Sequence, residues 1–480
     1  MNLRAVLHVV AILIILEGIA LLTGIAFSLF YGDGDAGAIL ISSAVCLLAG
    51  GLLFLATRNQ DELKLREGFA VVVLGWSALT LFGALPFLIS GTVPSFSDAF
   101  FETMSGFTTT GATILTNIEA MPHGLLFWRS LTHWLGGMGI VVLSLAILPL
   151  LGVGGMQLFK AEVPGPVKDR LSPRIADTAK ILWGVYLLLT LIEVVLLLFG
   201  GMSLFDSLCH TFGSMATGGF STKNASVAHY NSLYIEMVIL VFMFLAGTNF
   251  SLHYRFLAGK RDVYRLDREF RFYLFLTLIA ILIVSGIVYF SKPVSPGGAL
   301  RSASFQVVSI MTTTGFCSDN FELWLPSGQL LMILLMFIGG CAGSTGGSVK
   351  VIRIMVVLKH SLAEIKKLLH PNAYIPVRVG GRVLAPDVVT NILAFLIIYM
   401  LVFVAASIGM TLLGVDVVTA FSSVAATLGN IGPGLNLVGP VDHYGHLPAA
   451  GKWLLSFCML AGRLELYTVF ILFSPDFWKK

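Results

Sequence analysis

Apolar stretches of about 20 residues recur along the whole chain, separated by short polar segments. A helix of about 20 residues can cross roughly 30 Å of hydrocarbon, so each stretch is long enough to span a membrane. The pattern predicts ten membrane-spanning helices. They cover residues 5–30, 36–57, 68–90, 125–150, 178–200, 233–257, 272–291, 329–358, 388–412 and 450–474.

Four further apolar segments are too short to cross, and we expect them to be re-entrant helices. They lie near 95–108, 203–215, 299–311 and 416–427. Each runs into a Thr/Gly motif: TTTGAT (Thr108–Thr113), ATGGFS (Ala216–Ser221), TTTGFC (Thr312–Cys317) and TLGNIG (Thr427–Gly432). If Gly111, Gly218, Gly315 and Gly429 are equivalent, the motifs repeat at intervals of 107, 97 and 114 residues.

This repeat predicts an all-α membrane protein in which four parallel membrane-pore-membrane units surround one pore, preceded by two extra N-terminal helices. The expected division is an N-terminal pair (1–60), then repeats at 61–160, 161–260, 261–370 and 371–480.

The composition agrees with a lipid environment. Hydrophobic residues make up 56% of the chain and charged residues 12%, about half the share in a soluble domain, and the mean hydropathy is +0.89. Of the 30 Lys and Arg, 24 fall on one side of the predicted topology. By the positive-inside rule this side is cytoplasmic, with both termini, and all four Thr/Gly motifs face outward. The net charge of +4 therefore needs no nucleic acid, and the five scattered cysteines predict neither a disulfide nor a zinc site.

The Thr/Gly motifs have the chemistry that a desolvated cation requires. Backbone carbonyl and hydroxyl oxygens can replace the hydration shell of K⁺, and Gly allows backbone angles that turn successive carbonyls toward one axis. The predicted filter residues are Thr109, Thr110, Gly111, Ala216, Thr217, Gly218, Thr313, Thr314, Gly315, Leu428, Gly429 and Asn430. We expect K⁺ itself at Thr110, Gly111, Thr217, Gly218, Thr314, Gly315, Leu428 and Gly429. Leu428 stands where the other motifs have Thr, so the ring of ligands is irregular.

The sequence Gly339–Ser348 has five glycines in ten residues, in the middle of a predicted span. Non-helical backbone at membrane depth is tolerated only inside protein or beside water, so this segment is predicted to reach under the third motif as a gate. The gate glycines are Gly339, Gly340, Gly343, Gly346 and Gly347. A stripe of small residues for close helix packing is the alternative. Beyond it, Lys350 and Arg353 are expected to mark the inner membrane boundary.

Arg463 lies ten residues from both Trp453 and Phe473, near the middle of the last predicted span. A charge at this depth is costly unless it faces water or a partner. We expect it to act as a positive barrier in the pathway, together with the Gly-rich segment. The alternative is a buried ion pair with Glu193 or Glu17.

The four motifs, the sequence GGCAGSTGGS and the sequence LAGRLELYT (Leu460–Thr468) resemble the Trk/Ktr/HKT superfamily of potassium transporters over the whole chain, most closely its bacterial TrkH/TrkG type. The resemblance implies K⁺ as the transported ion without an organic cofactor, and a homodimer in the lipid of the bacterial inner membrane. It also implies a cytosolic ring of TrkA-like nucleotide-binding subunits that controls the gate.

A coupled symporter and an enzyme are the two alternatives to a channel-like transporter. A K⁺ symporter coupled to H⁺ or Na⁺ is the main alternative, although coupled carriers more often have inverted repeats and an ionisable site at the midplane. An enzyme is not expected, because no HExxH motif, paired carboxylates or Ser/His dyad lies at membrane depth.

Overall fold

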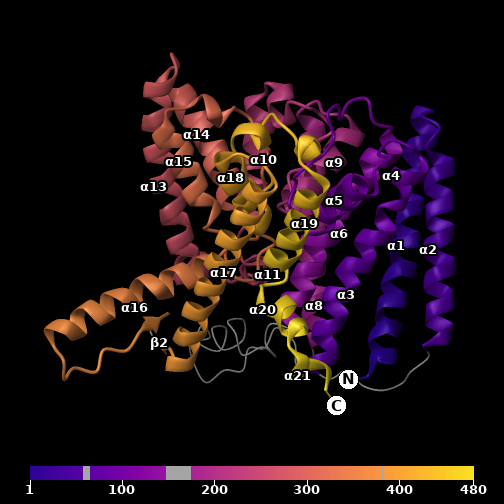
Figure 1. The fold of residues 1–480 in the computed structure, drawn as a ribbon. Coiled ribbons are helices and arrows are strands. Elements are labelled where there is room, and N and C mark those ends of the chain that lie inside the picture. The colour runs from indigo at the N-terminus through magenta and orange to yellow at the C-terminus, as the bar shows by residue number, and fades with distance from the viewer. Residues whose placement is uncertain (58–64, 147–174, 381, 480) are drawn as a thin grey trace.

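The computed structural model describes residues 1–57, 65–146, 175–380 and 382–479, with the side chains of 65, 141–146, 175–177 and 382 excepted. Helices stand side by side in one broad layer, and both termini lie at the same edge of that layer (Figure 1). In the described part, six helices are long and apolar enough to cross a membrane, or eight if each of two bent helix pairs counts as one span.

After an N-terminal pair, α1 (Leu3–Tyr31) and α2 (Ala36–Ala56), the chain repeats one order four times: long helix, short helix, loop, second helix. The first helices are α3 (Leu65–Gly83, followed by α4, Leu85–Ile89), α8 (Ile175–Phe199), α13 (Arg268–Ser291) and α17 (Pro386–Leu412). The short helices are α5 (Phe96–Phe107), α9 (Leu204–Met215), α14 (Pro296–Met311) and α18 (Val417–Leu428). The second helices are α6 (His123–Ala146), α10 (Leu233–Ala246), α15 (Pro326–Met336) and α19 (Ala449–Arg463).

The remaining elements are short or peripheral. They are the helices α11 (Phe250–Leu257), α12 (Val263–Leu266), α16 (Val351–Leu369), α20 (Tyr467–Phe470) and α21 (Pro475–Trp478), five 3₁₀ turns, and the antiparallel strands β1 (Arg378–Val379) and β2 (Arg382–Val383). The turns are η1 (Ser226–Tyr230), η2 (Phe321–Leu323), η3 (Asn436–Val438), η4 (Tyr444–His446) and η5 (Ile471–Phe473).

The four units close into a ring. The short helix α9 packs against α6 of the preceding unit, α14 packs against α10, and α18 packs against α15. The ring is completed by α5 of the first unit, which packs against α19 of the last. Three of these short helices have an N-terminal Ser or Asp whose side chain accepts a backbone amide, namely Ser203, Ser295 and Asp416. Such caps stabilise helices that are too short to be stable alone.

Six predicted spans correspond to single helices or to the α3–α4 pair: 5–30, 36–57, 68–90, 178–200, 272–291 and 388–412. The four short apolar segments are the helices α5, α9, α14 and α18. The predicted span 125–150 begins as α6, but its end lies outside the described residues, as do the predicted repeat boundaries at 60/61 and 160/161.

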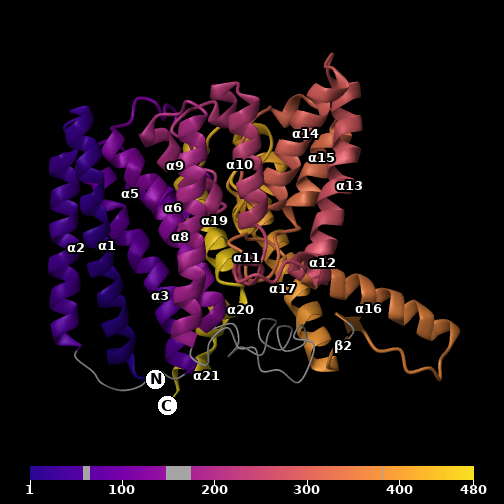
Figure 2. The same ribbon diagram turned by 180° about the vertical axis from the view of Figure 1, so that it is seen from behind.

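The predicted span 329–358 is wrong as a continuous helix. Its first part, α15, ends at Met336, residues 337–350 are not helical, and α16 then extends sideways from the helical layer (Figures 1 and 2). Glycines leave the backbone too much freedom for a stable helix in this segment.

Two other predicted spans bend sharply. Within 233–257, the axes of α10 and α11 differ by 101°, because Asn249 starts a new helix by accepting the amide of Ser251 at 2.8 Å. Within 450–474, α19 and α20 differ by 111°. At that bend Glu465 and Leu466 have φ angles of 64° and 42°, which are strained for residues with side chains.

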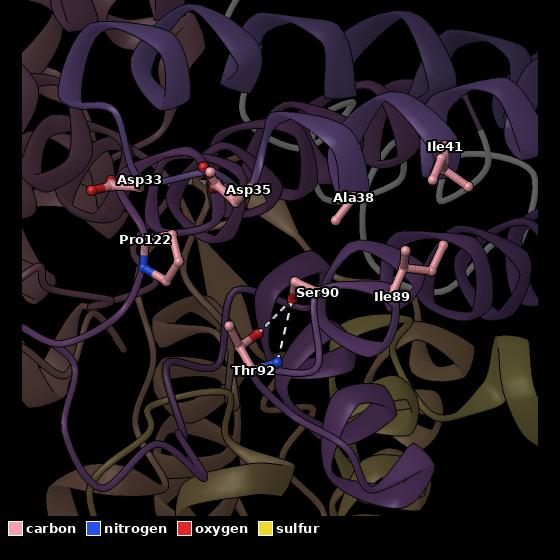
Figure 3. Close-up of a pocket in the computed structure, with 9 residues that line it drawn as sticks. Asp33, Asp35, Ala38, Ile41, Ile89, Ser90, Thr92 and Pro122 are labelled. Atoms are coloured by element: carbon pink, nitrogen blue, oxygen red, sulfur yellow. Dashed lines mark hydrogen bonds between the residues drawn. The ribbon is translucent and has the colours of Figure 1, made fainter.

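The N-terminal pair is held to the first unit by the turn between α1 and α2, beside a hollow of about 350 Å³ (Figure 3). The Asp33 carboxylate accepts the backbone amide and the ring nitrogen of His123, each at 2.7 Å, and Asp35 accepts the amide of Leu125 at 3.0 Å. Partial burial opposes ionisation of Asp33, but the hydrogen bonds and charge of His123 prevail and lower the pKa of this carboxyl group. These contacts hold the turn between α1 and α2 against the start of α6 in the first unit.

Candidate ion-binding site

The four short helices end in the same backbone conformation. The residue after each C-cap is not glycine yet has a left-handed φ: Thr109 (51°), Thr217 (53°), Thr313 (61°) and Asn430 (54°). Two positions later comes a glycine that is also left-handed: Gly111 (81°), Gly219 (80°), Gly315 (82°) and Gly432 (101°). We call residues 108–111, 216–219, 312–315 and 429–432 ring loops 1 to 4.

Each of these four glycines lies against a backbone carbonyl of the next ring loop. A β-carbon added to any of them would collide with that oxygen. The pairs, in order, are Gly111 with Gly218, Gly219 with Thr314, Gly315 with Ile431, and Gly432 with Thr110. The four carbonyl residues occupy one equivalent position, directly before the glycine of their own loop. The ring loops therefore close head to tail around one axis, which brings four equivalent backbone segments together.

This geometry corrects the register expected from sequence. The equivalent glycine is Gly219 rather than Gly218 in ring loop 2, and Gly432 rather than Gly429 in ring loop 4. Leu428, expected in the filter, is the last residue of α18 and is fully buried. The motif of the fourth unit, TLGNIG, contains two glycines three residues apart. Alignment with the Thr-Gly pairs of the other motifs selected Gly429, whereas Gly432 is the equivalent glycine. Asn430 could have indicated the correct register, since Asn tolerates the left-handed conformation that Thr109, Thr217 and Thr313 adopt in the other loops.

Side-chain hydroxyl groups form hydrogen bonds within and between the ring loops. The Thr108 and Thr110 hydroxyls are 2.8 Å apart, and the equivalent pair in ring loop 3 repeats this distance. The Asn430 side-chain amide donates to the Thr110 hydroxyl at 3.0 Å and to the Met459 carbonyl at 2.9 Å. Asn430 thus ties ring loop 4 to ring loop 1.

The Gly-rich segment Gly339–Ser348 lies directly against ring loops 3 and 4. The amide of Gly347 donates to the Thr313 hydroxyl at 2.6 Å, and Gly347 also contacts the carbonyl of Gly429. The Thr345 hydroxyl donates to carbonyls at the ends of α9 and α10, those of Met215 and Ala246, at 3.1 Å each. Thus all five predicted gate glycines belong to a non-helical segment packed between the ring and the second helices.

The family model described as "TrkH: Cation transport protein" matches residues 36–480. The chain belongs to the TrkH family. It is 43% identical to the Trk system potassium uptake protein TrkH of Salmonella typhimurium over the full length of both chains. It is 34% identical to the Trk system potassium uptake protein TrkG of Escherichia coli, covering 100% of this chain and 99% of the relative. The crystal structure of the potassium transporter TrkH from Vibrio parahaemolyticus has a TM-score of 0.92 at 40% identity, with both chains covered completely. TrkH proteins are transporters, in agreement with the expectation that this chain is not an enzyme.

In this TrkH-family chain, Arg463 is buried at the C-terminal end of α19 and not in the middle of a straight helix. Its Nη1 donates to the carbonyl of Thr345 in the Gly-rich segment at 2.7 Å. Within the described residues no carboxylate forms an ion pair with Arg463, so the expected alternative with Glu17 or Glu193 is not found; the Glu193 carboxylate instead accepts the Ser214 hydroxyl. The contact with Thr345 therefore places the Arg463 charge on the Gly-rich segment.

The two basic residues after the Gly-rich segment, Lys350 and Arg353, both contact other groups of the protein. The Lys350 ammonium donates to the Gly346 carbonyl, and Arg353 is 4% exposed and pairs with Glu465 at the bend of the last helix. The Arg353 guanidinium also lies 4.0 Å above the centre of the Phe395 ring. These contacts connect the end of the Gly-rich segment to the bend that follows Arg463.

We predict that Arg353→Ala destabilises the TrkH-family fold by about 1–3 kcal/mol, because the Glu465 carboxylate, whose side chain is 14% exposed, loses its charged partner. Thermal unfolding in detergent measures this, and the double variant Arg353→Leu/Glu465→Gln should recover part of the loss. The control is Lys367→Ala on the same helix, whose pair with Glu364 is solvent-exposed and should contribute no measurable stability. Equal unfolding temperatures for Arg353→Ala and Lys367→Ala would contradict the prediction.

We also predict that the observed register, and not the sequence register, governs function in the fourth unit. Gly432→Ser should impair ion flux as strongly as Gly315→Ser, because both add a side chain at a left-handed φ against a carbonyl. Leu428→Met keeps apolar volume in a buried helical position and should leave ion preference unchanged. If Leu428→Met changed ion preference while Gly432→Ser behaved like the wild type, the register expected from sequence, with Leu428 and Gly429 in the filter, would be correct.

Proposed function

We propose that this protein takes up K⁺ through a channel-like pore whose selectivity filter is the ring of four loops. The observation that carries the proposal is the cyclic contact of each ring glycine with the equivalent carbonyl of the next loop. Its relatives are named potassium uptake proteins, which supports K⁺ as the ion. A dehydrated cation needs several oxygen ligands at once, and four equivalent backbone segments around one axis can supply them.

The short helices strengthen this assignment through their direction. All four lead into the ring by their C-terminal ends, which carry partial negative charge. Those ends are buried, so solvent screens the helix dipoles little. A cation is stabilised there and an anion is not. The filter residues of the proposal are the threonines and glycines predicted from sequence, with Gly219, Ile431 and Gly432 added and Leu428 removed.

The Gly-rich segment and Arg463 form the proposed gate. The segment contacts two of the four ring loops, and Arg463 holds it by a charge-assisted hydrogen bond to Thr345. The Nε and Nη2 atoms of Arg463 have no hydrogen-bond partner among the described residues, so the charge of Arg463 is poorly compensated. A cation leaving the ring would meet this charge, which acts as a barrier while the segment is in place.

The proposed setting is a bacterial inner membrane with cytoplasmic termini, in a homodimer regulated by a TrkA-like ring. The name "Trk system" of the relatives supports partner subunits. Helix α16 extends from the layer and exposes apolar residues, Leu358, Leu362, Ile365 and Leu368 among them, on the side of both termini (Figure 1). Such a protruding helix offers a contact for a second copy or a cytosolic subunit.

Coupled symport remains a second candidate because of two carboxyl groups within the long helices. Both oxygens of Glu17 and one oxygen of Glu193 lack a hydrogen-bond partner among the described residues. Ionisable groups of this kind in membrane helices often take part in proton transfer. Rubidium uptake into liposomes, measured with and without an imposed pH gradient, separates the candidates. A channel needs no such gradient, whereas proton symport would respond to it and lose the response in Glu17→Gln or Glu193→Gln.

We predict that Gly111→Ser and Gly315→Ser each lower the preference for K⁺ over Na⁺ by about tenfold. The added side chain meets both a left-handed φ and a carbonyl, a strain of about 1–3 kcal/mol that displaces the ring oxygens. The matched control is Gly286→Ser in α13, where a β-carbon meets nothing within 4 Å. Competition between Na⁺ and rubidium uptake in liposomes gives the preference. Wild-type preference in both ring variants would refute the filter.

For the gate, we predict that Arg463→Ala raises basal flux by about tenfold without any regulatory partner. The reason is the loss of one charge-assisted hydrogen bond to the Gly-rich segment, about 1.5–3 kcal/mol, and of the positive barrier. Arg463→Lys should keep most of the barrier, since it keeps the charge. Liposome flux and protein yield are measured together. A low yield with reduced flux in Arg463→Ala would assign the residue a structural role instead.

A further inference from the structure

A repeated contact joins each of the first three ring loops to its own short helix on the outer side. The short helix carries a buried polar side chain nine residues before the ring glycine. This side chain forms a hydrogen bond with the side chain that lies two residues after the same glycine. The three pairs are Glu102 with Thr113, His210 with Ser221, and Gln306 with Cys317. A carboxylate, an imidazole and an amide side chain thus occupy the same position in the three units.

The bonds themselves are well formed. In the first unit the Thr113 hydroxyl donates to Glu102 at 2.8 Å, and the Ile114 amide donates to the other carboxylate oxygen at 2.8 Å. In the second unit, Nδ1 of His210 is 2.8 Å from the Asp206 carbonyl. Because a carbonyl only accepts, Nδ1 carries the proton, and Nε2 accepts the Ser221 hydroxyl at 2.9 Å.

In the third unit, the Gln306 side-chain amide donates to the Cys317 sulfur at 3.3 Å and to the Asp319 carbonyl at 2.6 Å. Glu102, His210 and Gln306 are each at most 1% exposed, so water cannot replace a lost partner. Losing the contact to the loop therefore removes a buried hydrogen bond that water does not replace, although Glu102 keeps its bonds to Ile114 and Arg129 and Gln306 keeps its bond to Asp319.

The fourth unit departs from the pattern. The equivalent pair is Ser423 and Gly434; Ser423 donates to Ala420 of its own helix, and Gly434 has no side chain. The neighbouring Ser422 instead bonds the backbone of Leu435, at 3.0 Å from its amide and 3.1 Å from its carbonyl. Ser423 is therefore a natural control for the position without the contact.

Arg129 couples the first contact to the second loop. Its Nε donates to Glu102 at 2.6 Å, and its Nη1 donates to the carbonyl of Ser221 at 3.0 Å. Its guanidinium lies 3.5 Å above the centre of the ring of Phe220, the residue after Gly219. Arg129 also compensates the buried Glu102 charge, so the arrangement is stable at membrane depth.

We propose that Glu102, His210 and Gln306 are positioning residues that clamp the outer ends of ring loops 1 to 3 and thereby set ion preference. The inference rests on the proposed filter. Each clamp ends two residues from a ring glycine, so a loop released there is free to move the carbonyl that precedes that glycine. Ion preference depends on how these oxygens are held, and a small displacement changes it.

The test replaces the clamp partners without changing their shape. Thr113→Val removes the hydroxyl, Thr113→Ser keeps it, and Gln306→Leu removes the amide, with Ser423→Ala as the control. Rubidium uptake by the full-length protein in liposomes, with Na⁺ as competitor, should show a preference lowered about three- to tenfold in Thr113→Val and Gln306→Leu, in line with one lost buried bond. Thr113→Ser and Ser423→Ala should keep the wild-type preference.

A purely structural role would lower yield and unfolding temperature while leaving ion preference unchanged, and that result overturns the inference. If Thr113→Val does not fold, Cys317→Ala and Cys317→Ser decide, because only the serine can still accept from Gln306. Gly315→Ser in the same assay separates the two proposals. A changed preference there with normal clamp variants overturns the clamps alone, whereas no change in any variant overturns the filter as well.

Discussion

The close approach of four glycines to four carbonyls determines the rest of this structure. Each ring glycine must have a left-handed φ and no β-carbon, since the next loop occupies that space. For the loops to meet this closely, the short helices that precede them must converge, and each packs against the preceding unit. The surrounding long helices then bury these short helices and expose apolar side chains outward.

Polar chemistry is concentrated around that contact, where water cannot supply missing partners. On the side of the ring opposite the Gly-rich segment, buried side chains of the short helices bond the ends of the loops, and Arg129 spans two units. On the other side, the Gly-rich segment donates to Thr313 and accepts from Arg463. The ring is therefore held in two different ways: by side-chain hydrogen bonds on one side, and by a non-helical backbone segment on the other. Under the proposed function, a fixed side suits selection among ions, and a backbone segment without helical bonds suits movement.

The breaks in the helices are part of the same arrangement. The 111° bend after Arg463, the non-helical residues 337–350 and the 101° bend before Asn249 all lie near the Gly-rich segment. Phe250, directly after the last of these, donates its amide to Gly343, and Arg353 joins the segment to Glu465. Straight helices would fill this space. Bent ones leave room for a loop below the ring and supply the backbone groups that bind it.

The sequence alone determined six of the apolar spans, the four short helices and the position of the Gly-rich segment, because apolar run length and glycine content act locally. It did not determine the register of the ring. Gly219 and Gly432 were missed in favour of Gly218 and Gly429, since the choice depends on which glycine meets a carbonyl from a loop about one hundred residues away. The clamp positions also become equivalent only after that register is known. The bend at Glu465 has no local signal either: a strongly apolar helix was expected to continue, and the tertiary contacts of Arg463 and Arg353 decided that it ends.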